Sequence, residues 1–328
     1  MSKESCLSPV ESGQYIAANS DHIRISKEAV TKTAGQIYGG VDQKEYAASW
    51  RNRAVQPEET PEWIFLIDLL NFSFWSPDPS TEFAVEYDGA VYTDYFALCA
   101  VVKRAHKEGL KLTHPDVQSR LTYEEFAHAF RSATAQPIPL LKERYELVRE
   151  AGQTMIKLYD GSFANCVKKC ERSAQKLISV VVRDFPSFRD EAEFKGQKVS
   201  FYKRAQILVA DLWACFEGQG LGEFRDIETL TAFADYRVPQ ILRYFGILLY
   251  DETLEETLEK GTVMSSGDPL EVEIRGCTIW AVELIKKEFM KTDINSMLVD
   301  FYLWNAATDM LTDSTPGNPA HKTRSFYY

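Results

Sequence analysis

The sequence predicts a mostly α fold: a single compact helical domain over residues 1–328, with a small antiparallel β-hairpin. Three observations predict it. Apolar residues recur at helical spacing along most of the chain, capping residues and glycines separate these segments, and strand-like alternation is clear in one place. Hydrophobic residues make up 45% of the 328 residues and aromatic residues 12%, which is enough for a substantial core.

The first part of the chain has a weakly patterned start followed by helices. Residues 1–20 show no clear periodicity, and we expect part of this segment to be mobile. Ser26 begins a capping-box pattern for a helix that starts near Glu28 and ends at Gly39. The apolar segment 63–70 fits either a strand or a buried helix, and we favour a helix because the apolar pattern continues beyond it.

One segment has the alternation of a β-hairpin. Asp88-Gly89 separates alternating apolar residues at 83–87 and 91–93, and an Asp-Gly pair in that setting is a strong turn signal. Thr122 and Glu125 form a further capping box. Helices are expected in order over residues 44–52, 95–107, 126–132, 140–158, 163–182, 202–217, 238–249, 254–260, 271–287 and 295–309, with a loop at 57–61 and a short element at 227–233.

The net charge of −11 and the pI near 5.1 bear on the partner. Proteins that hold a nucleic-acid backbone usually present clustered Lys and Arg, whereas pairs such as Lys168-Lys169 are isolated here. We therefore expect a small molecule as the partner and no nucleic-acid polymer. The chain has no apolar run of about 18 residues, so no membrane span is expected. Residues 1–20 do not resemble a signal peptide, which indicates a cytoplasmic location.

The cysteines and histidines do not indicate a metal site. Cys166 and Cys170 have the spacing of a helix face, which differs from zinc and redox motifs. The five histidines are scattered along the chain. We expect free buried thiols, no metal and no cofactor.

Residues 233–240, Phe-Ala-Asp-Tyr-Arg-Val-Pro-Gln, contain the main candidate for chemistry. Asp235 lies between two aromatic residues, and aromatic surroundings remove water from a carboxylate. A desolvated carboxylate is suited to stabilise an oxocarbenium-like transition state. The structural alternative is that Asp235 caps the helix that begins near Pro239. The octapeptide by itself leaves both interpretations open.

Several further blocks accompany this octapeptide in order along nearly the whole chain. They are Asn71-Phe72-Ser73-Phe74-Trp75, Asn165-Cys166-Val167, Ser173-Ala174-Gln175-Lys176-Leu177, residues 200–211 (Ser-Phe-Tyr-Lys-Arg-Ala-Gln-Ile-Leu-Val-Ala-Asp), residues 271–277 (Glu-Val-Glu-Ile-Arg-Gly-Cys) and Asp300-Phe301-Tyr302-Leu303-Trp304. Together with the octapeptide, they resemble the queuosine salvage family, the queuosine 5′-phosphate N-glycosylases. So many long blocks in order make a chance match very improbable.

The resemblance implies hydrolysis of the N-glycosidic bond of queuosine 5′-monophosphate and release of queuine. Queuine is a 7-deazaguanine, so protonation at N7 is not available and the ribosyl cation needs more stabilisation. Asp235 is the candidate, as covalent nucleophile or as electrostatic stabiliser. By fold-level analogy, a short loop with Asp235 at its end resembles the helix–loop–helix of base-excision glycosylases.

The resemblance also assigns residues to the base. Phe233 is expected to stack on the base or to be a core residue at the helix end. Asp300 matches a family position that binds the base, and Phe301 follows it in the same block. At Asn305 the related proteins have a second Asp, so this chain keeps a hydrogen-bonding group for the cyclopentene diol of queuine but lacks a charge.

Three other residues are candidates for substrate binding. Trp50 stands where relatives have a ligand-contacting His, so it either stacks in its place or the contact is absent. Lys203 is a candidate for the 5′-phosphate or for an ion pair with Asp235, and Arg237 is a second phosphate candidate. A structural salt bridge is the alternative for each cation.

Two other functions stay open. The chain could be a helical protein that holds queuine or a modified nucleotide without turnover, or it could be a DNA or RNA glycosylase. Asp235 distinguishes a hydrolase from the binding protein, because binding alone needs no desolvated carboxylate. The acidic charge argues against the second. The active site is expected where the 233–240 loop meets the 300–305 helix.

Overall fold

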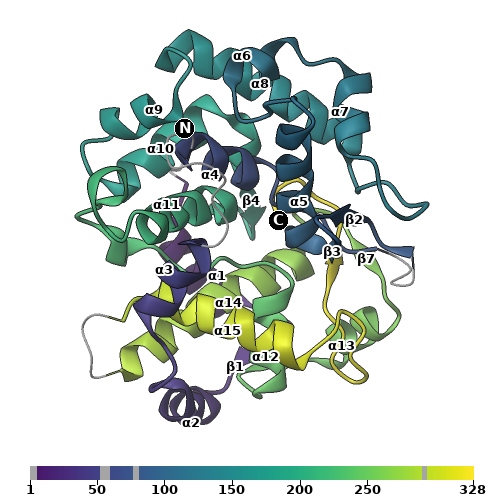
Figure 1. The fold of residues 1–328 in the computed structure, drawn as a ribbon. Helices are drawn as coiled ribbons and strands as arrows, with labels where there is room; N and C mark the ends of the chain where they lie inside the picture. Colours follow the sequence, from purple (N-terminus) through teal and green to yellow (C-terminus); the bar gives the residue numbers. More distant parts are fainter. Residues whose placement is uncertain (1–5, 52–59, 77–80, 290–293) are drawn as a thin grey trace. The chain divides into compact units, whose positions relative to one another are not determined.

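The computed structural model describes residues 6–51, 60–76, 81–289 and 294–328, and the predicted mostly α fold is confirmed there. These residues form fifteen α-helices and four two-stranded β pairs (Figure 1). The contacts divide the chain into two compact units. Unit 1 comprises Met1–Ala47, Arg189–Gln206 and Asp226–Ser325, and unit 2 comprises Ala48–Phe188, Ile207–Arg225 and Phe326–Tyr328. Two helices, α3 (Gln43–Arg51) and α11 (Lys203–Cys215), each contain a unit boundary.

Unit 1 is built around one long helix, α14. Its helices are α1 (Pro9–Asn19), α2 (Lys27–Ile37), α12 (Arg237–Tyr244), α13 (Glu252–Glu259), α14 (Pro269–Glu288) and α15 (Ser296–Met310), with a 3₁₀ helix η5 (Ile227–Thr229). The strands are β1 (Ile23–Ile25), β4 (Glu191–Phe194), β5 (Gln197–Ser200), β6 (Leu248–Tyr250), β7 (Val263–Met264) and β8 (Lys322–Thr323). Helix α14 packs against α1, α2, α12 and α15 (Figure 1).

Local chemistry explains why α14 lies at the centre. Asp268 caps it by accepting the Leu270 N–H at 2.9 Å, and Pro269 occupies its first turn. Its side chains are buried on nearly all sides, as expected of a core helix. Gly276 admits α1, because a Cβ at that position would lie 2.5 Å from the Ile16 side chain.

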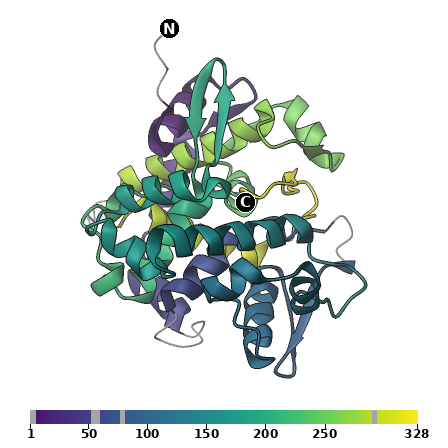
Figure 2. The same cartoon turned by 90° about the horizontal axis from the view of Figure 1, so that it is seen from above.

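Three β pairs belong to unit 1, of which none was predicted. Strands β1 and β6 are antiparallel, and β7 and β8 are parallel. Strands β4 and β5 form a hairpin next to α1 (Figure 2). Its turn residues Lys195 and Gly196 have φ of 49° and 80°, the positive values that a two-residue hairpin turn requires. The expectation of one hairpin in the chain was therefore wrong, because Lys-Gly is a weaker sequence signal than Asp-Gly.

Unit 2 contains the predicted hairpin. Strands β2 (Ala84–Tyr87) and β3 (Ala90–Thr93) pair as predicted, with Asp88 and Gly89 at φ 52° and 78°. The other elements are α4 (Thr60–Leu69), α5 (Asp94–Lys107), α6 (Pro115–Arg120), α7 (Tyr123–Ala129), α8 (Leu141–Tyr159), α9 (Phe163–Lys169), α10 (Ala174–Asp184), η3 (Pro186–Phe188) and η4 (Gly220–Gly222). Helix α5 packs on the hairpin, and α8 packs on α6.

Helix α4 is buried along its whole length, which confirms the helix favoured for 63–70. The chain that follows it is held by Arg144, whose side chain is fully buried. Arg144 donates hydrogen bonds to the carbonyl oxygens of Pro139, Leu70 and Phe72.

Other boundaries differ from the sequence predictions. Residues 163–182 form two helices, because Glu171 and Arg172 adopt positive φ and Ser173 caps α10. The helix predicted over 238–249 ends at Tyr244 and is followed by β6. Residues 9–19 form α1, where no helix was predicted. In the described part of the chain, no helix is long and apolar enough to cross a membrane.

Candidate functional site

The segment 230–236 in unit 1 has no regular secondary structure, and residues 230–235 are buried. Buried irregular backbone needs hydrogen-bond partners from elsewhere. Three side chains of unit 1 supply them. Gln206 accepts the Thr231 N–H at 2.9 Å, Asp300 Oδ1 accepts the Phe233 N–H at 2.8 Å, and Arg275 Nε donates to the Ala234 carbonyl at 3.0 Å. The segment is therefore fixed from outside on both sides of Phe233.

Asp235 ends this segment, with 7% of its surface exposed. Its Oδ1 accepts the N–H groups of Arg237 and Val238 at 2.8 and 3.0 Å, at the start of α12. The capping role considered for Asp235 is therefore present, and it uses only one carboxylate oxygen. Within the described residues no hydrogen bond reaches Oδ2. The cap orients the carboxylate and leaves its second oxygen available for other chemistry.

Asp300 of α15 and Lys203 of α11 interact electrostatically with Asp235. Burial and, to a smaller extent, the charge of Asp235 raise the pKa of Asp300 to about 8, against the opposing effects of the Phe233 N–H and Lys203. Burial lowers the pKa of Lys203, while the charges of Asp235 and Asp300 oppose this shift. Asp235, Asp300 and Lys203, here called the acid–lysine cluster, are all less than one-tenth exposed.

The predicted base-binding residues lie on two elements. Phe233 is buried in the fixed segment. Phe301 packs against Tyr46, with ring centroids 4.5 Å apart. Asn305 is half-buried on α15, four residues after Phe301 and five after Asp300. At about 100° per residue, Asn305 shares a helix face with Phe301 and lies about 140° around the helix from Asp300.

The remaining predicted residues differ in their surroundings. Arg237 pairs with Asp313 at 3.1 Å and donates to the Leu311 carbonyl, so the structural alternative considered for it is present. Lys203 has no carboxylate within ion-pair distance among the described residues, although both cluster carboxylates act on it. The side chain of Trp50 lies outside the described residues.

A buried ion pair lies beside the cluster. Arg275 bonds Asp190 at 2.6 and 2.9 Å and Glu271 at 3.3 Å. Glu271 is four residues before Arg275, so the two share a face of α14. Glu273 accepts hydrogen bonds from residues 20–22. Asp190 was not predicted, because it is 85 residues from Arg275 and no local pattern links them.

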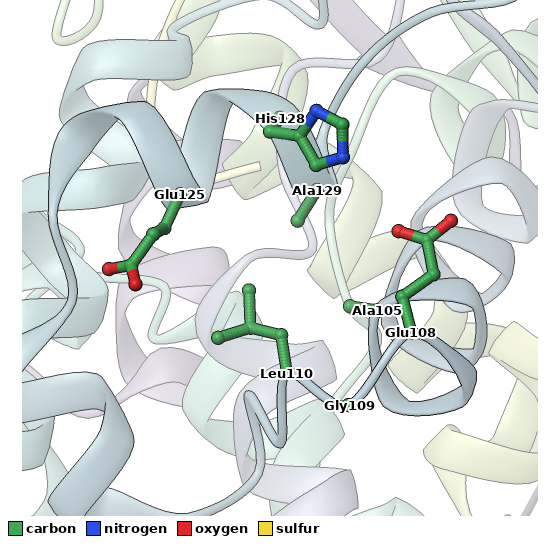
Figure 3. A pocket seen from close by; sticks show the side chains of 7 residues that line it. All are labelled: Ala105, Glu108, Gly109, Leu110, Glu125, His128 and Ala129. Carbon is green, nitrogen blue, oxygen red and sulfur yellow. The ribbon is translucent and has the colours of Figure 1, made fainter.

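Unit 2 has a hollow of about 330 Å³ lined by Ala105, Glu108, Gly109, Leu110, Glu125, His128 and Ala129 (Figure 3). The carboxylates of Glu108 and Glu125 lie on opposite sides of Leu110 in Figure 3, and each has an interaction partner. Glu108 pairs with Arg131, and Glu125 completes the capping box with Thr122. None of the predicted site residues with a described side chain lines this hollow.

Comparisons with known proteins show what the whole chain is similar to. The family described as "Queuosine salvage protein" matches residues 51–328. Three similar proteins are named queuosine 5′-phosphate N-glycosylase/hydrolase. The protein of Mus musculus is 43% identical over 98% of this chain and 99% of its own length. Those of Nematostella vectensis and Schizosaccharomyces pombe are 40% and 38% identical, over 98% and 97% of this chain and 98% and 99% of their own lengths.

Proposed function

The chain belongs to the queuosine salvage protein family, and on that basis we propose that it hydrolyses the N-glycosidic bond of queuosine 5′-monophosphate and releases queuine. The observation that carries the proposal is near-full-length similarity, at 38–43% identity, to proteins named for this activity. In the reaction the bond between C1′ and the base nitrogen breaks, and water supplies the oxygen that bonds to C1′. One proton of the water goes to the base and the other stays on the new ribose hydroxyl. No cofactor enters this balance.

The acid–lysine cluster supports different roles for its two carboxyl groups. With a pKa of about 8, Asp300 keeps its proton at pH 7, and Asp235 carries the negative charge of the pair. Asp235 Oδ2, the oxygen outside the cap, is the group that stabilises or traps the ribosyl oxocarbenium. The protonated Asp300 donates a hydrogen bond to an acceptor on the base.

The proposal assigns the other residues as follows. Phe233 stacks on the base, Phe301 lines the pocket and Asn305 bonds the diol. For Trp50, whose side chain lies outside the described residues, both alternatives, a stacking contact or no contact, stay predictions. Lys203 is the better phosphate candidate of the two cations, because Arg237 already pairs with Asp313. Lys203 also balances the charge of Asp235 when no substrate is bound.

The substrate is a free nucleotide and not a nucleic-acid polymer. The net charge of −11 opposes binding to a phosphate backbone. A cytoplasmic location is part of the same proposal, since queuine salvage there would return the base to the compartment in which tRNA is modified.

The test is a chromatographic assay of queuine release. Wild-type protein is expected to release queuine from the 5′-monophosphate, more slowly from queuosine, and not from intact tRNA. Asp235→Asn is expected to abolish turnover while queuine binding stays within about tenfold, because the variant loses transition-state stabilisation and little ground-state contact.

A matched control separates chemistry from capping. Asp251 caps α13 of the same unit by accepting the Leu254 N–H at 2.9 Å, so Asp251→Asn alters a comparable cap. It is expected to keep activity. If Asp235→Asn also stays active, Asp235 is a cap alone. Queuine binding without release by wild-type protein would favour a binding protein.

A further inference from the structure

Arg275 makes more hydrogen bonds than a single ion pair needs. Its side chain is 2% exposed on α14. Nη1 and Nη2 donate to the two oxygens of Asp190 at 2.9 and 2.6 Å, Nη1 also reaches Glu271, and Nε donates to the Ala234 carbonyl at 3.0 Å. The guanidinium lies over the Phe201 ring, 4.1 Å from its centroid. One planar group therefore holds a carboxylate and a backbone carbonyl in fixed directions.

Asp190 passes this restraint to the start of α11. Its Oδ2, which accepts from Arg275, also accepts the Lys203 N–H at 3.2 Å. Its backbone carbonyl accepts the Phe201 N–H at 2.9 Å. Tyr202, the residue before α11, has φ of 48°. It is not one of the Ser, Thr, Asp or Asn residues whose side chains usually cap the start of a helix. The Asp190 carboxylate, 13 residues before Lys203, therefore takes the place of an N-cap side chain at the start of α11.

The two ends of this network adjoin two members of the acid–lysine cluster. Ala234, held by Arg275, is bonded to Asp235, and Lys203, capped by Asp190, is itself a member. We propose that Arg275 and Asp190 are positioning residues, which set the separation of Asp235 and Lys203 without contacting substrate. This inference rests on the proposed function, because the separation matters only if the cluster acts on a substrate.

Stability alone does not account for the network. A buried ion pair regains its desolvation cost only with favourable geometry, and apolar replacements are often as stable. Positioning accounts for the fork geometry, since displacement of a catalytic group by about 1 Å can cost on the order of 100-fold in rate. A lysine at 275 would keep the positive charge but could not bond Asp190 in two places and Ala234 at once.

The first experiment measures kcat and KM for queuosine 5′-monophosphate with Arg275→Lys and Asp190→Asn. We expect Arg275→Lys to lower kcat by about 100-fold and to change KM by less than about threefold, since substrate contacts remain. Asp190→Asn keeps an oxygen that can cap α11, and we expect it to lower kcat by about tenfold. Arg243→Lys is the control, because it also weakens an Arg–Glu pair of unit 1, in which Arg243 is largely buried and Glu255 is half-buried.

Circular dichroism and thermal melts establish the folded fraction of each variant. Arg243→Lys is expected to lower the melting temperature and leave kcat unchanged. If Arg275→Lys and Arg243→Lys lower kcat equally per folded molecule, the positioning role is overturned. An unchanged kcat in Arg275→Lys overturns it as well.

A second readout does not depend on activity. The Asp300 carboxyl, whose pKa is about 8, is followed by ¹³C NMR titration. Arg275→Lys is expected to lower this pKa, because a loosened 233–235 segment brings water and moves the charge of Asp235. Arg243→Lys should leave it unchanged. If the wild-type protein releases no queuine, the proposed function fails, and an Asp300 titration identical in wild type and Arg275→Lys separately overturns the positioning role.

Discussion

At the scale of single residues, burial decides which carboxyl of the site holds a proton. Asp300 is 4% exposed and its pKa is about 8, against about 3.9 in an unfolded chain. Between those two values the folded protein binds the additional proton. The contribution of Asp300 to stability therefore falls as the pH rises from about 4 to about 8, and is constant above that range.

Asp300→Asn tests this sign directly. The amide is neutral at every pH, and its oxygen can still accept the Phe233 N–H that Asp300 accepts. The free energy of unfolding of the variant, relative to wild type, is expected to rise by a few kcal/mol between pH 5 and pH 8. Urea denaturation at several pH values measures it. A difference that does not change with pH would contradict the raised pKa.

Some residues of the candidate site could be proposed from the sequence and others could not. Asp235, Asp300 and Lys203 were proposed because each lies in a block of unusual residues, and their action on a substrate stays a prediction. The same blocks included Arg275, but its partner Asp190 could not be found. Hydrogen bonds between residues 85 positions apart depend on tertiary structure, and no periodicity or local pattern in one sequence encodes them.

At the scale of elements, signals within one turn of helix were the most dependable. The Thr122–Glu125 capping box was predicted and is present in both directions: Thr122 Oγ1 accepts the Glu125 N–H, and Glu125 accepts the Thr122 N–H at 2.9 Å. The prediction of one helix over 163–182 failed because it rested on apolar spacing along a longer segment. Its apolar spacing continues through the break, and only the backbone conformation of Glu171 and Arg172 separates the two helices.

Thr122→Ala removes a cap on the surface of unit 2, whereas the residues of the acid–lysine cluster belong to unit 1. The expected cost is about 1 kcal/mol in the free energy of unfolding, with unchanged turnover. Thr257→Ala is the matched control: Thr257 sits within α13 and its hydroxyl donates to the Thr253 carbonyl. That substitution is expected to be neutral or slightly stabilising. Equal losses in the two variants would show that the capping box contributes nothing.

At the scale of the whole molecule, composition and periodicity were sufficient for the fold class. They did not reveal the division into two units, because each unit gathers three separate segments of the chain. Local patterns describe one segment at a time. Which segments assemble depends on buried contacts of long sequence separation, such as those of α14 with α1.

The single domain predicted for residues 1–328 stays a prediction, and the way the chain passes between the two units suggests how to test it. The chain changes unit five times, so no single cut yields either unit as one continuous polypeptide. Two of these changes fall inside helices α3 and α11. Because helices form cooperatively, unfolding the part of α11 in one unit weakens the part in the other.

We therefore expect one cooperative thermal transition. Differential scanning calorimetry should give a calorimetric enthalpy equal to the van't Hoff enthalpy, as in two-state unfolding. If queuine binds the native protein and not the unfolded chain, it should raise the midpoint of that transition without splitting it. Scans at two rates control for irreversible loss of the unfolded chain. Two resolved transitions, or a calorimetric enthalpy well above the van't Hoff value, would mean that the two units unfold independently.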